Sequence, residues 1–70
     1  MKVKDIDKEK TYYRGGQFVE KWSGAELFYL LGDEPKDDIT EYYIAETEIE
    51  AYKLLIKSLK KEIKRLENEN

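Results

Sequence analysis

The chain of 70 residues contains no cysteine and no histidine, and these two absences exclude much chemistry. Without cysteine, neither a disulfide bond nor a thiolate metal site can form. Without histidine, the most common general base and metal ligand is missing. No apolar stretch is long enough to cross a membrane, and residues 1–5 lack the apolar run of a signal peptide. We therefore predict a cytoplasmic, non-enzymatic protein with no cofactor, no metal ion and no membrane contact.

Charged side chains are abundant instead: they make up 41% of the chain and leave a net charge of −3. Residues 1–46 hold 7 basic and 11 acidic side chains, whereas residues 47–70 hold 6 and 5. One Trp, six Tyr and two Phe, together with a patterned set of aliphatic residues, favour a packed core over disorder. The composition therefore predicts a single small α+β domain over residues 1–70.

The glycine pair Gly15–Gly16 separates two β-prone runs and indicates a β-hairpin. Tight hairpin turns need positive φ angles, which glycine adopts more easily than other residues. The runs that we interpret as strands are about 10–14, 17–22 and 39–46, with 3–6 as a candidate fourth. Together they predict a small antiparallel hairpin or meander.

Residues 25–31 fit two structures. Ser23 and Glu26 form a capping box, and Gly32 stands where a helix would stop, which favours a short helix. The alternative makes residues 23–24 a second tight turn and 25–31 a buried strand. Residues 33–38 combine proline with charged residues and predict a loop.

The last third of the chain predicts a long amphipathic helix at about 48–68, which begins with a capping box at Thr47 and Glu50. Its apolar residues recur at alternating spacings of three and four and form one continuous stripe, which we call the seam. The seam consists of Ile49, Tyr52, Ile56, Leu59, Ile63 and Leu66.

In heptad terms the seam places isoleucine at every a position and Tyr52, Leu59 and Leu66 at d, and isoleucine at a with leucine at d is the preference of parallel two-stranded coiled coils. Glu62 would however face Glu67 of a parallel twin, and Leu54 and Leu55 widen the apolar arc as a helix lying on a sheet requires. We expect residues 49–59 to pack on the strands and 60–70 to be a projecting helical tail. The alternatives are a helix packed wholly on its own sheet and a foreign partner. The residues that we assign to self-association, with a dimer favoured, are Ile56, Leu59, Ile63 and Leu66.

Adjacent tyrosines in strands point to opposite faces, and one covering helix buries only one face of a sheet. The other face is therefore expected to expose aromatic side chains, which are favoured at protein interfaces. An acidic cluster follows in the 33–41 region. The residues that we assign to binding another protein are Tyr13, Trp22, Asp37, Asp38, Glu41 and Tyr42.

Basic residues alternate with aromatic ones along the predicted hairpin, a pattern that can stack the bases of a single-stranded nucleic acid. The acidic balance of the chain makes nucleic acid the less favoured partner. The acidic clusters lack the glycine and ligand spacing of an EF-hand loop and are read as solvated charge. The hypothesis that remains is a small regulatory or inhibitory protein that blocks a partner's surface. Size and charge make it analogous to phage and mobile-element inhibitors of host enzymes.

Overall fold

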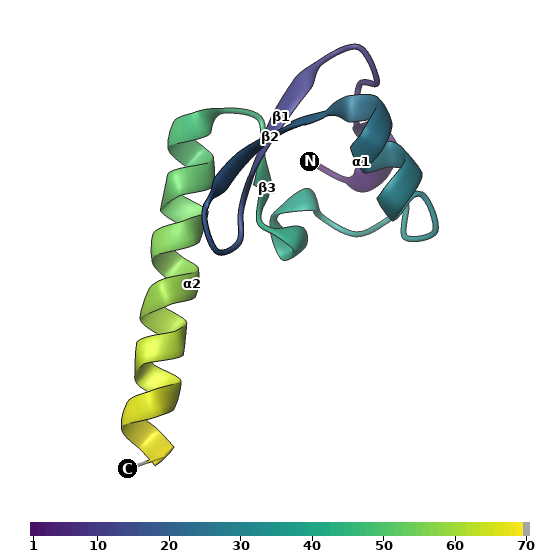
Figure 1. Cartoon of the computed structure of the whole chain (residues 1–70). Coiled ribbons are helices and arrows are strands. Elements are labelled where there is room, and N and C mark those ends of the chain that lie inside the picture. Colours follow the sequence, from purple (N-terminus) through teal and green to yellow (C-terminus); the bar gives the residue numbers. More distant parts are fainter. Residues whose placement is uncertain (70) are drawn as a thin grey trace.

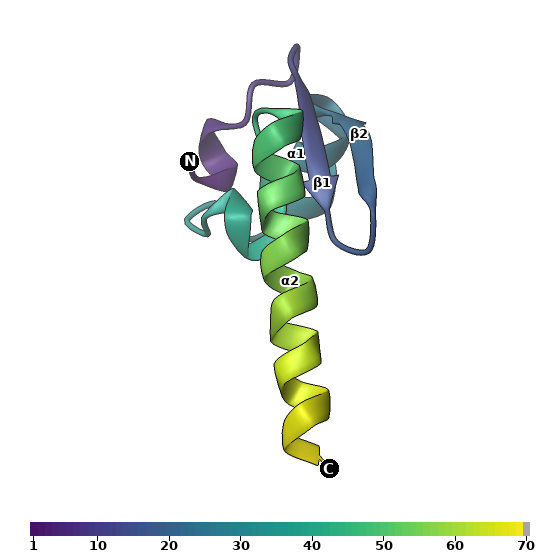
Figure 2. The same cartoon turned by 90° about the vertical axis from the view of Figure 1, so that its left-hand side faces the viewer.

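The computed structural model of the chain describes residues 1–69, in which a small antiparallel sheet lies between a long helix and a layer of shorter helical segments (Figures 1 and 2). The strands lie in the order β2-β1-β3. They are β1 (Thr11–Gly15), β2 (Val19–Ser23) and β3 (Ile44–Ala45). The helical segments are η1 (Val3–Asp5), α1 (Gly24–Leu31), η2 (Ile39–Tyr42) and α2 (Glu48–Glu69). The α+β class is confirmed.

The predicted hairpin is present, but its glycines act for a different reason. Gly15 pairs with Val19, so the turn contains the three residues 16–18, and no glycine of the chain has a positive φ angle. A methyl group on Gly15 would overlap the carbonyl oxygen of Ala51 in α2. Glycine is therefore needed at position 15 because α2 crosses the sheet at close range.

The core lies on the sheet face opposite α2. Tyr12 of β1 is buried there, and its hydroxyl accepts a hydrogen bond from the backbone N–H of Asp7 at 2.9 Å. The buried cluster consists of Val3, Ile6, Tyr12, Leu27, Ile39 and Ile44. The N-terminal segment, α1 and η2 cover this face, so the prediction that it exposes an aromatic surface is wrong. The prediction considered only one covering helix, whereas the shorter segments bury the second face.

Two predicted strands are largely helical turns. The run 3–6 forms η1, whose first N–H groups donate to backbone carbonyls of the 33–38 loop. The run 39–46 begins as η2 because the Asp38 carboxylate accepts a hydrogen bond from the backbone N–H of Thr40 at 2.9 Å. Tyr43 then adopts a left-handed conformation with φ 61°, which leaves only Ile44–Ala45 as a strand. Hydrogen bonds between local side chains and the backbone stabilised a helical turn in a segment whose composition favours a strand.

The capping box at Ser23 decides the ambiguous segment in favour of a helix. The Ser23 hydroxyl accepts from the backbone N–H of Glu26 at 3.2 Å and donates to the Glu26 carboxylate at 3.0 Å. Gly24 begins α1, and a side chain there would overlap the carbonyl oxygen of Asp7. The helix alternative for residues 25–31 is confirmed, and α1 packs Leu27 into the core.

Thr47 begins α2 as predicted, because its hydroxyl accepts a hydrogen bond from the backbone N–H of Glu50 at 3.2 Å. Beyond Ser58 the helix leaves the body of the protein, which we define as residues 1–58 (Figure 2). The Cα radius of gyration is 13.2 Å, compared with about 11 Å for a compact domain of this length. The projecting part of α2 accounts for this elongation.

Candidate interaction surfaces

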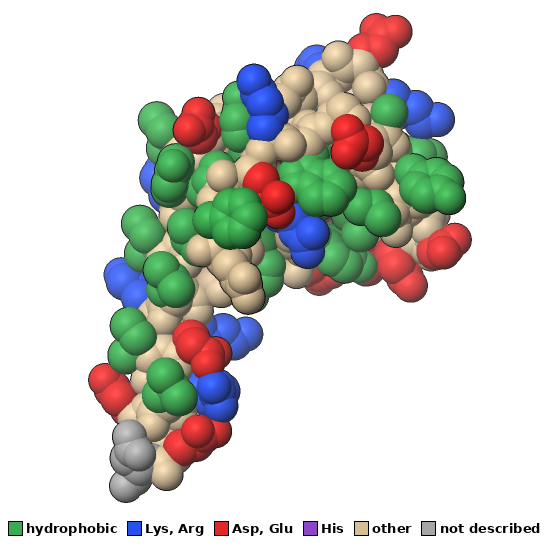
Figure 3. Space-filling view, viewed as in Figure 1, with side chains coloured by type: hydrophobic (Ala, Val, Ile, Leu, Met, Phe, Trp, Pro, Cys, Tyr) green, Lys and Arg blue, Asp and Glu red, His purple; other side chains and the backbone are tan. Residues whose placement is uncertain are grey.

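The seam of α2 is exposed along its whole length. The exposed fraction of its six residues ranges from 48% for Leu66 to 69% for Ile49. Apolar side chains accordingly line the outer side of the helix (Figure 3). Residues 49–59 do pack on the strands as expected, but the seam residues among them do not make that contact.

A second stripe of α2 makes the contact with the sheet. Ala51 is fully buried, and Leu54, Leu55 and Ser58 are partly buried. Leu55 lies close to Gly15, whose hypothetical methyl group would be 3.4 Å from the Leu55 Cβ atom. These residues are neighbours at helical spacings of three and four and form a face beside the seam. The leucines that widened the apolar arc therefore hold the helix on the sheet, and the seam remains uncovered.

The distal half of α2, residues 59–69, has every residue exposed. Arg65 links two turns within it: its guanidinium donates to the Glu62 carboxylate at 3.1 Å through Nε and to Glu69 at 2.7 Å. The hydrogen bond and charge of Arg65 hold the pKa of Glu62 below its usual value. Ion pairs between exposed residues of one helix stabilise it only weakly. The distal half thus has little besides its own backbone hydrogen bonds to keep it helical.

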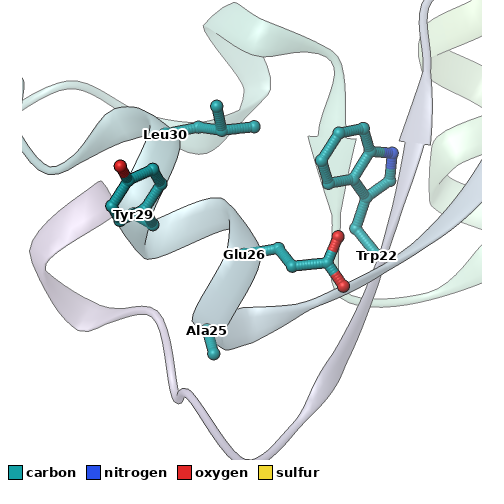
Figure 4. A pocket seen from close by; sticks show the side chains of 5 residues that line it. All are labelled: Trp22, Ala25, Glu26, Tyr29 and Leu30. Carbon is teal, nitrogen blue, oxygen red and sulfur yellow. The ribbon is translucent and has the colours of Figure 1, made fainter.

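A second apolar surface is a hollow of about 520 Å³ beside α1 (Figure 4). Its lining residues are Trp22, Ala25, Glu26, Tyr29 and Leu30. Tyr29 is 88% exposed. The indole ring of Trp22 forms one wall of the hollow. Its nitrogen points away from the hollow and is buried without a hydrogen-bond partner. We call this surface the α1 hollow.

The structure separates the two aromatic residues assigned to partner binding. Trp22 pairs with Tyr12, whereas Tyr13 pairs with Lys21, so Tyr13 and Trp22 point to opposite faces of the sheet. Trp22 borders the α1 hollow, and Tyr13 lies on the side of α2. The sequence analysis did not identify Tyr29, although α1 has more apolar residues than its single core-facing side requires.

The acidic residues assigned to partner binding are mostly engaged within the protein. The Tyr42 hydroxyl donates to Asp37 at 2.6 Å, and this hydrogen bond raises the pKa of Tyr42 to about 12. Asp38 accepts from the backbone and hydroxyl of Thr40, which lowers its pKa, and its carboxylate is 3.4 Å from the amino group of Met1. Glu41 is exposed. Asp37, Asp38 and Tyr42 therefore fix the loop that precedes and forms η2.

Two of the basic side chains considered for nucleic-acid binding lie against aromatic rings of the protein itself. The Lys8 amino group lies 4.5 Å from the centre of the Phe28 ring, and the Arg14 guanidinium lies 6.0 Å from that of Trp22. Tyr12 is buried, and Phe18 in the hairpin turn is exposed. The hairpin thus lacks the row of open rings that base stacking requires.

Among residues 1–69, no group of three or more acidic, histidine or cysteine side chains is placed to hold a metal ion. No helix of this described part is long and apolar enough to cross a membrane. No protein-family model, no curated protein and no solved structure matches the chain. The seam and the α1 hollow are therefore the two features of the molecule that bear on its function.

Proposed function

We propose that the protein is a non-enzymatic interaction module that forms a homodimer through the seam of α2 and acts by occupying a surface of another protein. The observation that carries this proposal is the seam itself: six apolar residues, each about half exposed or more, on one side of a 22-residue helix. Contiguous apolar surface of this kind on a small protein is typical of a binding site.

A second copy is the occupant that best matches the chemistry of the seam. Isoleucine at a and leucine at d are self-complementary in two-stranded coils, and α2 spans about 33 Å at 1.5 Å per residue. The distal half leaves the body after Ser58, so a partner helix can reach it without meeting the sheet. A helical segment of this length is marginally stable alone in water. Association therefore supplies the packing that the distal half lacks.

The body supplies the surface for the second protein. The α1 hollow is apolar, and Glu26 is the charged group in its lining. Residues 1–46 carry four more acidic than basic side chains (7 against 11), so the body favours a partner with basic and aliphatic residues. By occupying such a partner's surface the protein would act as a regulator or inhibitor, as small acidic proteins of phages and mobile elements do.

Sedimentation equilibrium tests the homodimer. The variant Ile63→Gln/Leu66→Gln removes two apolar side chains from each chain but keeps good helix formers, so we expect a monomer where the wild type is dimeric. Burial of each side chain contributes about 1.5–3 kcal/mol when complete, so the dissociation constant should rise at least about 100-fold. The matched control is Lys61→Gln/Lys64→Gln, which lies off the seam and should leave the dimer intact. A wild type that is monomeric at every soluble concentration would contradict the proposal.

Affinity capture tests the role of the α1 hollow. A wild-type bait should retain one specific protein from the native host. Leu30→Asp places a charge in the hollow and should abolish that retention, whereas Gln17→Asp, in the exposed hairpin turn, should not. Equal retention by both variants would show that the partner binds elsewhere.

A further inference from the structure

We propose that the two copies of α2 pair in parallel and in register, so that each seam residue meets its own counterpart. This inference rests on the proposed homodimer and specifies its geometry. It derives from the charges that flank the seam, from the ion pairs of Arg65 and from the side on which the body lies.

The flanks of the seam differ in charge. With Ile49 at position a, the e edge and the g edge of the helix are the positions next to the interface. The residues at e are Lys53, Lys60 and Glu67. The residues at g are Glu48, Leu55, Glu62 and Glu69. In a parallel dimer the g edge of one helix faces the e edge of the other, whereas in an antiparallel dimer like edges meet.

The parallel arrangement brings opposite charges together at the start of the helices. Glu48 of one copy faces Lys53 of the other, and this pair occurs twice. Lys53 is exposed, and its ion pair with Glu50 of its own helix at 3.2 Å is between exposed groups and therefore weak, so its long side chain can turn to Glu48 of the other copy instead. Two turns further on, Leu55 meets the aliphatic part of Lys60, which favours packing without a charge conflict.

The antiparallel arrangement aligns Ile49 with Leu66 of the second copy and also overlaps the whole seam. Its edges, however, place Lys53 against Lys60 and Glu48 against Glu69, each pair twice. All of these are like charges, which destabilise neighbouring helices. This arrangement also sets the distal Glu62 of one copy against Leu55 of the other, beside the sheet, where the carboxylate of the Glu62–Arg65 ion pair loses water.

One pair opposes the parallel arrangement, namely Glu62 with Glu67 of the second copy. The structure shows how this conflict is reduced. Arg65 binds the Glu62 carboxylate from position c, which lies on the side of α2 away from the seam. The carboxylate is thereby drawn away from the interface and neutralised by a guanidinium. The repulsion that the sequence alone suggests is consequently weakened.

The position of the body agrees with this geometry. The sheet contacts α2 through Ala51, Leu55 and Ser58, at the c and g positions, and leaves the e edge exposed. In the parallel dimer each body therefore lies beside the open e edge of the other helix. The two bodies sit at the same end, on opposite sides of the coil.

Disulfide crosslinking distinguishes the arrangements, because the chain has no cysteine of its own. Leu66→Cys should crosslink efficiently in a parallel dimer, since the two sulfur atoms meet at one d layer. In the antiparallel dimer the two positions are separated by 17 residues, or roughly 25 Å, and cannot react. A mixture of Leu66→Cys with Ile49→Cys chains should then yield no crosslink between the two kinds of chain. Such mixed crosslinks would overturn the parallel assignment.

A charge substitution tests the orientation of the helices independently of disulfide crosslinking. Lys53→Glu turns the two Glu48–Lys53 attractions of the parallel dimer into repulsions, so we expect the dissociation constant to rise roughly 3- to 10-fold. In an antiparallel dimer the same change relieves the repulsion between Lys53 and Lys60, so the dissociation constant would fall. Lys57→Glu, at position b away from the interface, is the matched control for net charge. A tighter Lys53→Glu dimer overturns this inference, whereas a wild type that never dimerises overturns the homodimer itself.

Discussion

The two halves of α2 carry the same seam but have different surroundings. In the near half, Glu48–Ser58, a second stripe that includes Ala51 and Leu55 packs on the sheet. Seven and fourteen residues further along the same stripe, the distal half has Glu62, Arg65 and Glu69, which pair with one another. The stripe that serves the fold thus changes from apolar to charged where the sheet ends. The seam stays apolar and exposed in both halves, as the proposed homodimer requires.

The largest expected effect comes from a substitution that disrupts the contact of the near half with the sheet and leaves the distal half unchanged. Gly15→Ala introduces a methyl group that overlaps the carbonyl oxygen of Ala51, so α2 must move away from β1. We expect the free energy of unfolding to fall by about 1–3 kcal/mol in chemical denaturation. Gly16→Ala is the matched control, because no atom lies within 4 Å of its added carbon and its φ angle is negative. An unchanged free energy of unfolding in Gly15→Ala would mean that α2 does not approach the sheet in this way.

The second prediction concerns the distal half. Because all of its residues are exposed, its amide protons should be strongly protected from exchange only in the dimer. On dilution below the dissociation constant we expect protection of residues 59–69 to fall at least about tenfold, whereas residues 50–55 keep theirs. Hydrogen exchange measured residue by residue by NMR makes this comparison. Equal, concentration-independent protection in both halves would remove the difference between them.

A third prediction uses pH to probe the body alone. The hydrogen bond to Asp37 raises the pKa of Tyr42 to about 12 from its ordinary 10.0. Since the folded value is the higher one, this contribution to stability is complete below pH 10 and is lost as pH rises through 12. Ultraviolet absorbance should show a late phenol titration from Tyr42 that Asp37→Asn shifts to lower pH. Ile63→Gln/Leu66→Gln should leave it unchanged, because the neighbours that raise the pKa of Tyr42 are Asp37, Glu34 and Glu41.

The smallest expected effect lies in the distal half. Arg65 lowers the pKa of Glu62, so Arg65→Gln should raise that pKa toward 4.5. Because the folded value is depressed, this stabilisation is present above pH 4.5 and is lost as pH falls through the lower folded value. Carbon-13 NMR of the Glu62 carboxyl group measures the shift. If the pKa of Glu62 is the same with and without Arg65, the ion pair does not form in solution.

The sequence predicted the elements that have strong local signals. The capping boxes at Ser23 and Thr47 begin helices as expected, because each hydroxyl satisfies a free backbone N–H group. The strand expected over 39–46 failed for a comparable reason. Asp38 and Thr40 form a local cap that the count of β-formers ignored.

Long-range packing was harder to predict. Gly15 suggested a turn, whereas its function is to let Ala51 approach, and the two residues are far apart in the sequence. Periodicity identified the apolar arc of α2 but could not show which side the sheet would cover. A small residue such as Ala51 among longer ones was the available signal, since close backbone contact requires small side chains on both partners. The near half of α2 was therefore predicted correctly to lie on the sheet, but its seam residues were not separated from the residues that make that contact.

The extension of α2 beyond the sheet also has a consequence for binding strength. Because the seam faces away from α1, pairing of two α2 helices would leave the α1 hollow of each copy open. The dimer would then be bivalent. A target with two suitably spaced sites would meet the second hollow at a high effective concentration once the first is occupied. Two weak individual contacts could in this way act together as one durable attachment.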